Sequence, residues 1–274
     1  MAPRSPTGVV LGLAGHTSGM GQVMKLVVVV SAVIAVVGSF IGSGAWIGTP
    51  IAEAAGGALS ATSTLVAPAG TAFSIWSVVY GGFLAYAIWQ FLPGRTVRHE
   101  ALRPAIAVSM LLNAAWILSV QAGLLWLSVV IIASLLAVLA RVFVLLQRQR
   151  PENGIDAVIT DGTMGLYLGW VCVATIANVT AWLVDLGITS AATTWAVIVL
   201  AVAAMVGVGL ATGSRGAIAP SIGIVWGLAW VAQGRLGGEV ANTAVGISAV
   251  LAALLVGVYT AGVRLDLTGA HPAK

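Results

Sequence analysis

Long apolar stretches separated by short polar loops make up most of this 274-residue chain, and they leave little charge between their ends. Only 7% of the residues are charged and 59% are hydrophobic, whereas a water-soluble domain carries about a quarter charged residues. A chain of this composition has no polar face to present to water. The sequence therefore predicts an all-α, polytopic membrane protein built as a helical bundle.

The apolar stretches can be counted as membrane spans, because a helix needs about 20 apolar residues to cross the hydrocarbon layer. The seventh stretch is the shortest, and Pro220 is a potential break in it. The short Ala122-Gly123 link predicts that the third and fourth spans form an antiparallel hairpin. The eight predicted spans are 26–46, 73–92, 104–122, 124–146, 163–184, 194–212, 217–231 and 240–262.

Lysine and arginine support this count, because cytoplasmic loops retain them. With eight spans and both termini in the cytoplasm, Arg235 is the one positive charge of the twelve that falls outside. We therefore expect a multi-pass protein of the cell membrane, with both termini cytoplasmic. The sequence pI of 9.7 fits attraction to anionic lipid headgroups. Membrane lipids are the expected surroundings, and nucleic acid is not an expected partner.

The spans are poor in ionisable groups, which argues against several functions. This span assignment places His16, His99 and His271 in tails or loops, so no histidine is expected to hold a haem inside the bundle. The eight acidic residues fall in loops or at span ends, which argues against ion-coupled transport. No metal-ligand cluster, phosphate loop or nucleophile motif is found, so the sequence predicts no metal site and no catalytic residue.

Three spans carry aromatic and amide side chains at helical spacing, so that each set falls on one face. Asn113 and Asn178 would be costly facing lipid, at roughly 4–8 kcal/mol on a cyclohexane scale, and are expected to point inward. The faces would then enclose a volume suited to a flat, mainly apolar ligand. The same spacing also fits asparagines that only hydrogen-bond helix to helix. The three sets are Phe73, Trp76, Tyr80 and Phe83; Ser109, Asn113, Trp116 and Val120; and Tyr167, Trp170, Ala174, Asn178 and Trp182.

These positions carry a resemblance to a known family. Leu112-Asn113-Ala114-Ala115-Trp116, and Tyr167-Leu168-Gly169-Trp170-Val171 followed by Ala174-Thr175, Asn178 and Trp182, resemble the third- and fifth-helix signatures of the TspO/MBR family of tryptophan-rich sensory or translocator proteins. Pro68, Phe73, Trp76 and Tyr80 resemble its entry into the second helix. Thr71 stands where that family commonly has a tryptophan, and Ala177 replaces a leucine.

The resemblance implies a five-helix bundle with a ligand pocket beneath the loop that joins the first two helices. We call residues 47–72 the lid loop. It includes Glu53 and Pro68, and its small residues suit mobility. The implied ligands are porphyrins or other tetrapyrroles, no cofactor is obligatory, and several family members form homodimers. The implied ligand-binding residues are Phe73, Trp76, Tyr80, Asn113, Trp116, Tyr167, Trp170, Ala174 and Asn178.

The resemblance ends near residue 185, which divides the chain. We expect a flexible tail (1–24), a five-helix bundle (25–185), a three-helix extension (186–263) and a C-terminal tail (264–274). The predicted function is binding of a flat, tetrapyrrole-like ligand in a sensory or trafficking role. Transport of a small neutral or lipid-like substrate is the alternative. The protein is not expected to be an enzyme, although light-dependent chemistry on a bound porphyrin is conceivable.

Overall fold

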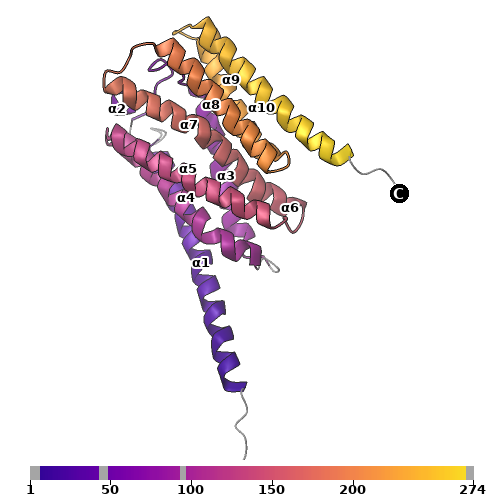
Figure 1. Cartoon of the computed structure of the whole chain (residues 1–274). Helices are drawn as coiled ribbons and strands as arrows, with labels where there is room; N and C mark the ends of the chain where they lie inside the picture. Colours follow the sequence, from indigo (N-terminus) through magenta and orange to yellow (C-terminus); the bar gives the residue numbers. More distant parts are fainter. Residues whose placement is uncertain (1–6, 43–48, 93–96, 270–274) are drawn as a thin grey trace, which may run out of the picture.

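The computed structural model describes residues 7–42, 49–92 and 97–269, and every regular element within these ranges is a helix. Most of the described chain lies in eight long helices, which Figure 1 shows packed side by side. They are α1 (Thr7–Gly42), α3 (Ile75–Trp89), α4 (Val97–Gln121), α5 (Leu125–Arg148), α7 (Thr163–Asp185), α8 (Ala192–Gly213), α9 (Ile218–Leu236) and α10 (Thr243–Gly269). The short elements are α2 (Ala54–Gly57), the 3-10 helix η1 (Gly70–Ser74), α6 (Gly154–Asp156) and the π-helix η2 (Ala157–Gly162).

Seven helical segments in the described ranges are long and apolar enough to cross a membrane. The exception among the predicted spans is the seventh, which forms the 19-residue helix α9 but is not one of these seven. Pro220 does not break α9, because it lies in the first turn, where a helix does not need the missing N–H. Helix α9 packs against both α7 and α10, so it is sheltered by apolar neighbours on two sides.

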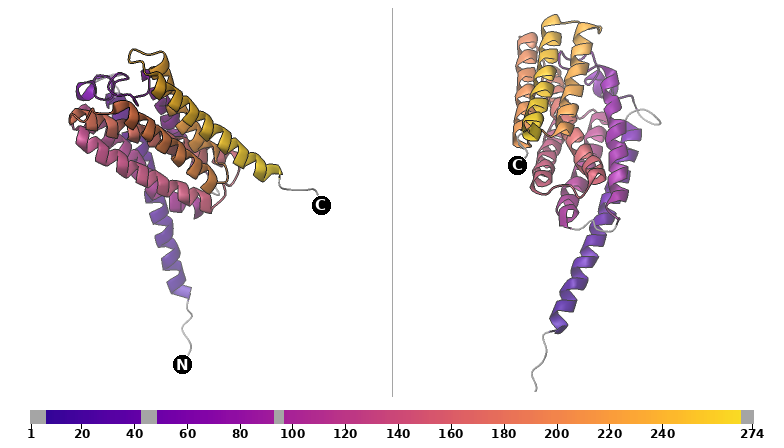
Figure 2. Two further views of the ribbon diagram at one scale, coloured as in Figure 1. Left: turned by 45° about the horizontal axis from the view of Figure 1, so that its top comes forward. Right: turned by 90° about the vertical axis from the view of Figure 1, so that its right-hand side faces the viewer.

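The helices associate largely in chain order. Helix α1 packs against α3 and α4, α5 lies between α4 and α7, and α10 covers both α8 and α9. The predicted hairpin of α4 and α5 is present, and Gly123 adopts the positive φ of 70° that its tight turn requires. Helices α1 and α10 carry the chain termini away from the end of the bundle where α2 lies (Figures 1 and 2). That this side is cytoplasmic stays a prediction.

The ends of the chain are more helical than the sequence suggested. Residues 7–24 of the expected flexible tail belong to α1, and residues 264–269 of the expected C-terminal tail belong to α10. The prolines of the N-terminal segment lie at positions 3 and 6, outside the described residues, so no proline interrupts the helix that follows. At 1.5 Å per residue, the 36 residues of α1 span about 54 Å. Its first part therefore extends beyond the other helices (Figure 1).

Helices α7 and α9 approach closely through facing glycines. A methyl group on Gly169 would collide with the carbonyl oxygen of Pro220 and lie 3.0 Å from the Cα atom of Gly223. A methyl group on Gly227 would lie 2.8 Å from a methyl carbon of Val173. The two small-xxx-small pairs, Gly165 with Gly169 and Gly223 with Gly227, therefore join the extension to the five-helix bundle within one chain.

A buried polar cluster closes the end of the bundle away from α2. Arg98 donates to Asp156 at 2.6 Å and to both oxygens of Asp161 at 2.6 Å. The Asp156 carboxylate also accepts from the Thr160 hydroxyl at 2.7 Å. His99 Nε2 lies 3.3 Å from the same carboxylate. We call Arg98, His99, Asp156, Thr160 and Asp161 the polar cluster.

The placement of two histidines in tails or loops was therefore wrong. His99 lies in the first turn of α4 and is fully buried, and the backbone of His16 lies in α1. Helix α4 begins at Val97, ahead of the expected start at 104, because Arg98 and His99 find partners in Asp156, the last residue of α6, and Asp161 of η2. His271 lies outside the described residues.

Candidate ligand-binding site

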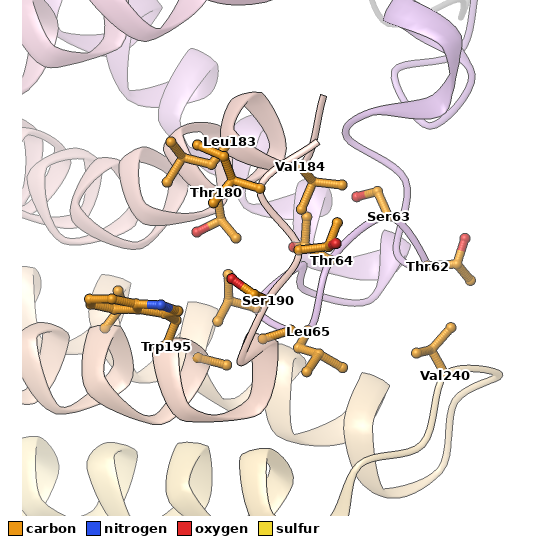
Figure 3. Close-up of a pocket in the computed structure, with 16 residues that line it drawn as sticks. Thr62, Ser63, Thr64, Leu65, Thr180, Leu183, Val184, Ser190, Trp195 and Val240 are labelled. Atoms are coloured by element: carbon orange, nitrogen blue, oxygen red, sulfur yellow. The ribbon is translucent and has the colours of Figure 1, made fainter. Parts of the chain in front are cut away.

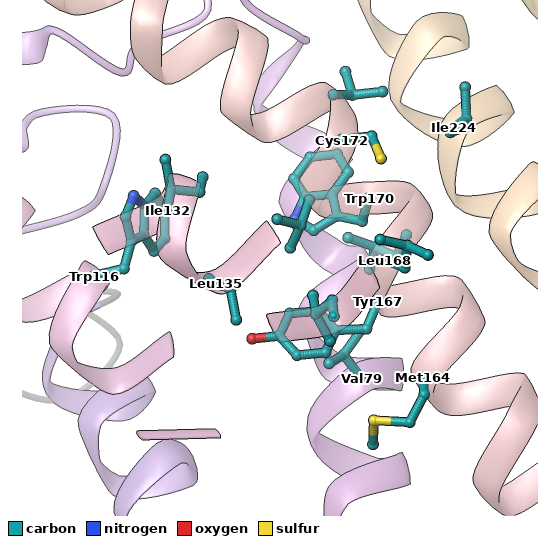
Figure 4. Close-up of a cluster of buried hydrophobic side chains, with 14 of the residues drawn as sticks. Val79, Trp116, Ile132, Leu135, Met164, Tyr167, Leu168, Trp170, Cys172 and Ile224 are labelled. Atoms are coloured by element: carbon teal, nitrogen blue, oxygen red, sulfur yellow. The ribbon is translucent and has the colours of Figure 1, made fainter. Parts of the chain in front are cut away.

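Aromatic rings from α3, α4 and α7 meet in the middle of the bundle. The Trp76 ring stacks on Tyr80 and Trp116, with centroid distances of 5.6 and 6.2 Å. The same ring contacts Tyr167 and Trp170 edge-on, at 5.8 and 6.2 Å. Figure 4 shows Trp116 on one side of this interior and the two α7 rings on the other. Edge-on and offset contacts at these distances are favourable for aromatic pairs.

The helical spacing explains this convergence. Phe73 lies in η1 just before α3, and its ring meets Trp170 edge-on at 5.8 Å. Residues three or four positions apart share a helix face, so α3 and α7 each turn two rings toward the interior, and α4 turns Trp116 and Asn113 toward it. We call the six rings of Phe73, Trp76, Tyr80, Trp116, Tyr167 and Trp170 the aromatic site.

The two asparagines of the site connect its helices. Tyr80 donates its hydroxyl to Asn113 Oδ1 at 2.8 Å. Trp116 donates its indole N–H to Asn178 Oδ1 at 2.7 Å, and Asn178 Nδ2 donates to the Ser128 hydroxyl at 2.9 Å. The alternative left open by the sequence, that the amides bond helix to helix, is therefore realised for both residues. Ser128, on α5, was not predicted, although a hydroxyl inside an apolar span was a signal for a buried partner.

Two polar atoms of the site have no hydrogen-bond partner in the described part of the chain. They are Asn113 Nδ2 and Trp170 Nε1, and each of these residues is only 1% exposed. A buried donor without a partner costs about 1–3 kcal/mol. Buried donors of this kind are met in proteins by ordered water or by the acceptors of a bound molecule.

Two cavities adjoin the aromatic site. A small chamber of about 30 Å³ lies below the lid loop, large enough for a water molecule but not for a larger ligand. A cleft of about 510 Å³ opens between α1, α3 and α4. Phe73 and Trp116 line both, so their rings separate the chamber from the cleft. The interior that we expected to enclose a ligand is thus mostly filled by the rings themselves.

The predicted residues are distributed over these two cavities as follows. Phe73, Trp116, Trp170, Ala174, Asn178 and the lid residue Pro68 line the chamber. Trp76 and Tyr80 line the cleft. Asn113 and Tyr167 line neither and pack behind the rings, where Tyr167 donates to the Ser109 carbonyl at 3.3 Å. Glu53 precedes α2, is exposed to solvent and lines neither cavity.

Helix α9 holds the lid loop over the chamber. Ala69 N–H donates to the Trp230 carbonyl at 3.1 Å, and Trp226 Nε1 donates to the Ala72 carbonyl at 2.9 Å. Arg235 donates to the Ala61 carbonyl. The extension therefore anchors the described part of the lid loop, which begins at residue 49. Residue spacing within a span could not indicate this role, because the α9 residues lie far along the chain from the loop.

Among the described residues, no group of three or more histidine, cysteine, aspartate or glutamate side chains could hold a metal ion. The one described cysteine, Cys172, is buried on α7. The residues that line the chamber and the cleft include no histidine.

The fold and the site together define a multi-span helical membrane protein with an aromatic cluster inside its bundle. Comparison with protein families matches residues 26–261 to the family described as TSPO-like protein. The chain belongs to this family, as its resemblance to the TspO/MBR proteins predicts. The match runs past residue 185 and includes α8, α9 and most of α10. Comparison with curated proteins and with solved structures gives no match.

Proposed function

We propose that this protein binds a flat, mainly apolar ligand of the tetrapyrrole class at the aromatic site, in the cell membrane and in a sensory or trafficking role. The observation that carries the proposal is the pair of buried donors without partners, Asn113 Nδ2 and Trp170 Nε1, among six aromatic rings. The rings offer flat faces for stacking. The two donors match acceptor atoms at the edge of a ligand.

Access to the site would come from the cleft. Its volume of about 510 Å³ is within the range of about 300–1,000 Å³ that is usual for small-molecule sites. Rotation of Phe73 and Trp116, which separate the cleft from the chamber, would let a flat molecule slide between the rings. The donors would then gain partners, and their desolvation cost would be offset in the complex.

In a sensory role, ligand binding would act through the lid loop. Phe73 lies in η1 directly after this loop, and Trp226 of α9 bonds to Ala72 beside it. A ligand that displaces the Phe73 ring would therefore move the segment that α9 holds. Sensing requires that ligand binding favour one of two states, and this segment is the element that ligand binding would shift.

Titration of the purified protein with protoporphyrin, followed by the porphyrin absorbance, tests the proposal. The expected result is saturable binding that Asn113→Ala and Trp170→Phe each weaken by about tenfold, because each variant removes one unpartnered donor. Trp126→Phe is the matched control, since Trp126 is 55% exposed and lies outside both cavities. Binding that the two site variants and the control affect equally would remove the aromatic site from the proposed function.

A further inference from the structure

A third cavity lies beside the aromatic site, at the junction of the five-helix bundle with the extension. It has a volume of about 440 Å³ and lies between residues 62–66 of the lid loop, the end of α7 and the start of α8 (Figure 3). Trp195 and Val240 complete its wall. Ser63 lines both this cavity and the chamber, so the two spaces share a wall but are otherwise formed by different residues.

The wall of the third cavity is apolar, with hydroxyl groups but no charge. Leu65, Val66, Leu183 and Val199 provide much of the apolar surface. The hydroxyl-bearing side chains are Thr62, Ser63, Thr64, Thr180, Thr189 and Ser190. None of the lining residues is ionisable, so the wall offers no ionic partner to an occupant with a charged group. The chemistry of the wall selects a neutral molecule.

One hydroxyl of this wall, that of Thr64, lacks a hydrogen-bond partner in the described part of the chain. Thr64 is 6% exposed, and its Oγ1 atom is buried with no hydrogen-bond partner in the described part of the chain. Thr180, in contrast, donates to the Ile176 carbonyl at 2.8 Å. A hydroxyl can both donate and accept, so Thr64 suits a partner group that is itself a hydroxyl or an ester carbonyl. Figure 3 shows Thr64 on the lid-loop side of the cavity.

The position of the cavity matches a ligand that arrives from the membrane. Trp195, at its α8 side, is 59% exposed, and tryptophan is enriched where a bilayer meets water. We infer that this cavity binds a neutral single-chain lipid with a hydroxyl-bearing headgroup, of the monoacylglycerol type. Its apolar chain would lie against Val199 and Leu183, and its headgroup would bond to Thr64.

A photoreactive probe tests the inference directly. The full-length protein in phosphatidylcholine liposomes is labelled with a monoacylglycerol that carries a diazirine in its acyl chain, and the labelled peptides are identified by mass spectrometry. The expected label is concentrated in residues 62–66 and 180–199, and an excess of unlabelled monoacylglycerol removes it. Label spread evenly over the lipid-facing helices, with no effect of the competitor, would overturn the inference.

Two variants and one control separate the site from general lipid contact. Thr64→Val keeps the side-chain shape, removes the unpartnered hydroxyl and is expected to lower the saturable labelling about five- to tenfold. Ala196→Phe fills the cavity from α8 and is expected to abolish it, since Ala196 lines the cavity and is 4% exposed. Thr212→Val, on an exposed part of α8 outside the cavity, is expected to change nothing. Saturable labelling that neither site variant reduces would contradict the assignment.

A fatty acid serves as the test of neutrality. Arg235 donates to the Ala61 carbonyl, next to the lining residue Thr62, but does not itself line the cavity. Unlabelled fatty acid is therefore expected to compete more weakly than the monoacylglycerol. If the fatty acid competes more strongly, the Arg235 guanidinium reaches the ligand and the neutral headgroup is the wrong choice.

Discussion

Trp116 on α4 donates its indole N–H to the side-chain carbonyl of Asn178 on α7 at 2.7 Å. The Asn178 amide in turn donates to Ser128 on α5, so one buried amide ties three helices together. Its neighbour Asn113 is bonded only through its oxygen and keeps an unpartnered Nδ2. The two asparagines therefore differ: both side-chain groups of Asn178 are hydrogen-bonded, whereas Asn113 keeps one donor, which we propose a ligand would meet.

Replacing Trp116 by phenylalanine keeps an aromatic ring but leaves Asn178 Oδ1 without its donor. We expect a loss of stability of about 1–3 kcal/mol, the cost of a buried polar atom left unpaired. Thermal unfolding in detergent, followed by circular dichroism, measures the change. The control is Trp126→Phe at an exposed position. Equal stability of the two variants would show that the bond to Asn178 contributes nothing.

The close contact of glycines between α7 and α9 can be tested with a pair of glycine-to-alanine variants. Gly169→Ala places a methyl group against Pro220 and Gly223, and overpacking of this kind costs about 1–3 kcal/mol. Gly209→Ala on α8 meets no atom within 4 Å and is expected to leave stability unchanged or to raise it by up to about 1 kcal/mol, because alanine favours helix. Thermal unfolding of both variants measures this difference in stability. A stable Gly169→Ala variant would mean that the two helices can separate without loss.

Within the polar cluster, the carboxylate of Asp156 is expected to contribute more to stability than that of Asp161. Asp156→Asn removes the fully buried one of the two carboxylates that face Arg98. Because Arg98 keeps Asp161 as a partner, we expect a loss of about 1–3 kcal/mol, the cost of buried hydrogen-bonding groups left unsatisfied. Asp161 is 28% exposed, so Asp161→Asn is expected to cost about 1 kcal/mol or less, as partly exposed ion pairs do. Unfolding in detergent at increasing denaturant ranks the two variants, with Asp185→Asn at an exposed helix end as control. The reverse order would contradict a central role for Asp156.

Helix α9 is expected to control the mobility of the lid loop. Trp226→Phe removes the hydrogen bond to the Ala72 carbonyl and keeps the ring. Amide hydrogen exchange in residues 64–74 should then rise severalfold, because exchange reports local opening. Exchange in α4 should not change. Trp126→Phe, at a ring that is 55% exposed on α5, is the control. Unchanged exchange in the loop would show that other contacts hold it.

The helical pattern and the convergence of the ring-bearing faces could be read from the sequence, since both depend on residue spacing. Trp76, Trp116 and Trp170 meet because each lies on the same face as a neighbouring amide or ring, three or four residues away. Spacing does not fix how far side chains interpenetrate. The expected ligand space is accordingly filled by rings, which leave a chamber of about 30 Å³.

The missed contacts join residues that are distant along the chain. Arg98 was counted among the cytoplasmic positive charges and Asp156 among the acids in loops or at span ends, but burial of the α4 start pairs them at 2.6 Å. Trp226 and Ala72 are 154 positions apart, and periodicity within one span says nothing of such pairs. Hydropathy alone also does not place α9 among the membrane-spanning helices, because its glycines and Arg235 lower its apolar character. Its neighbours α7 and α10 shelter it instead.

The indole N–H of Trp170 provides the most direct test of ligand binding at the aromatic site. Its nitrogen-15 NMR signal is assigned by its loss in Trp170→Phe and is then followed during titration with protoporphyrin. We predict a large shift of this signal that saturates with the binding curve, because the donor gains a partner beside the porphyrin ring, while the Trp126 signal stays in place. A Trp170 signal that remains unmoved at saturating porphyrin would contradict the account.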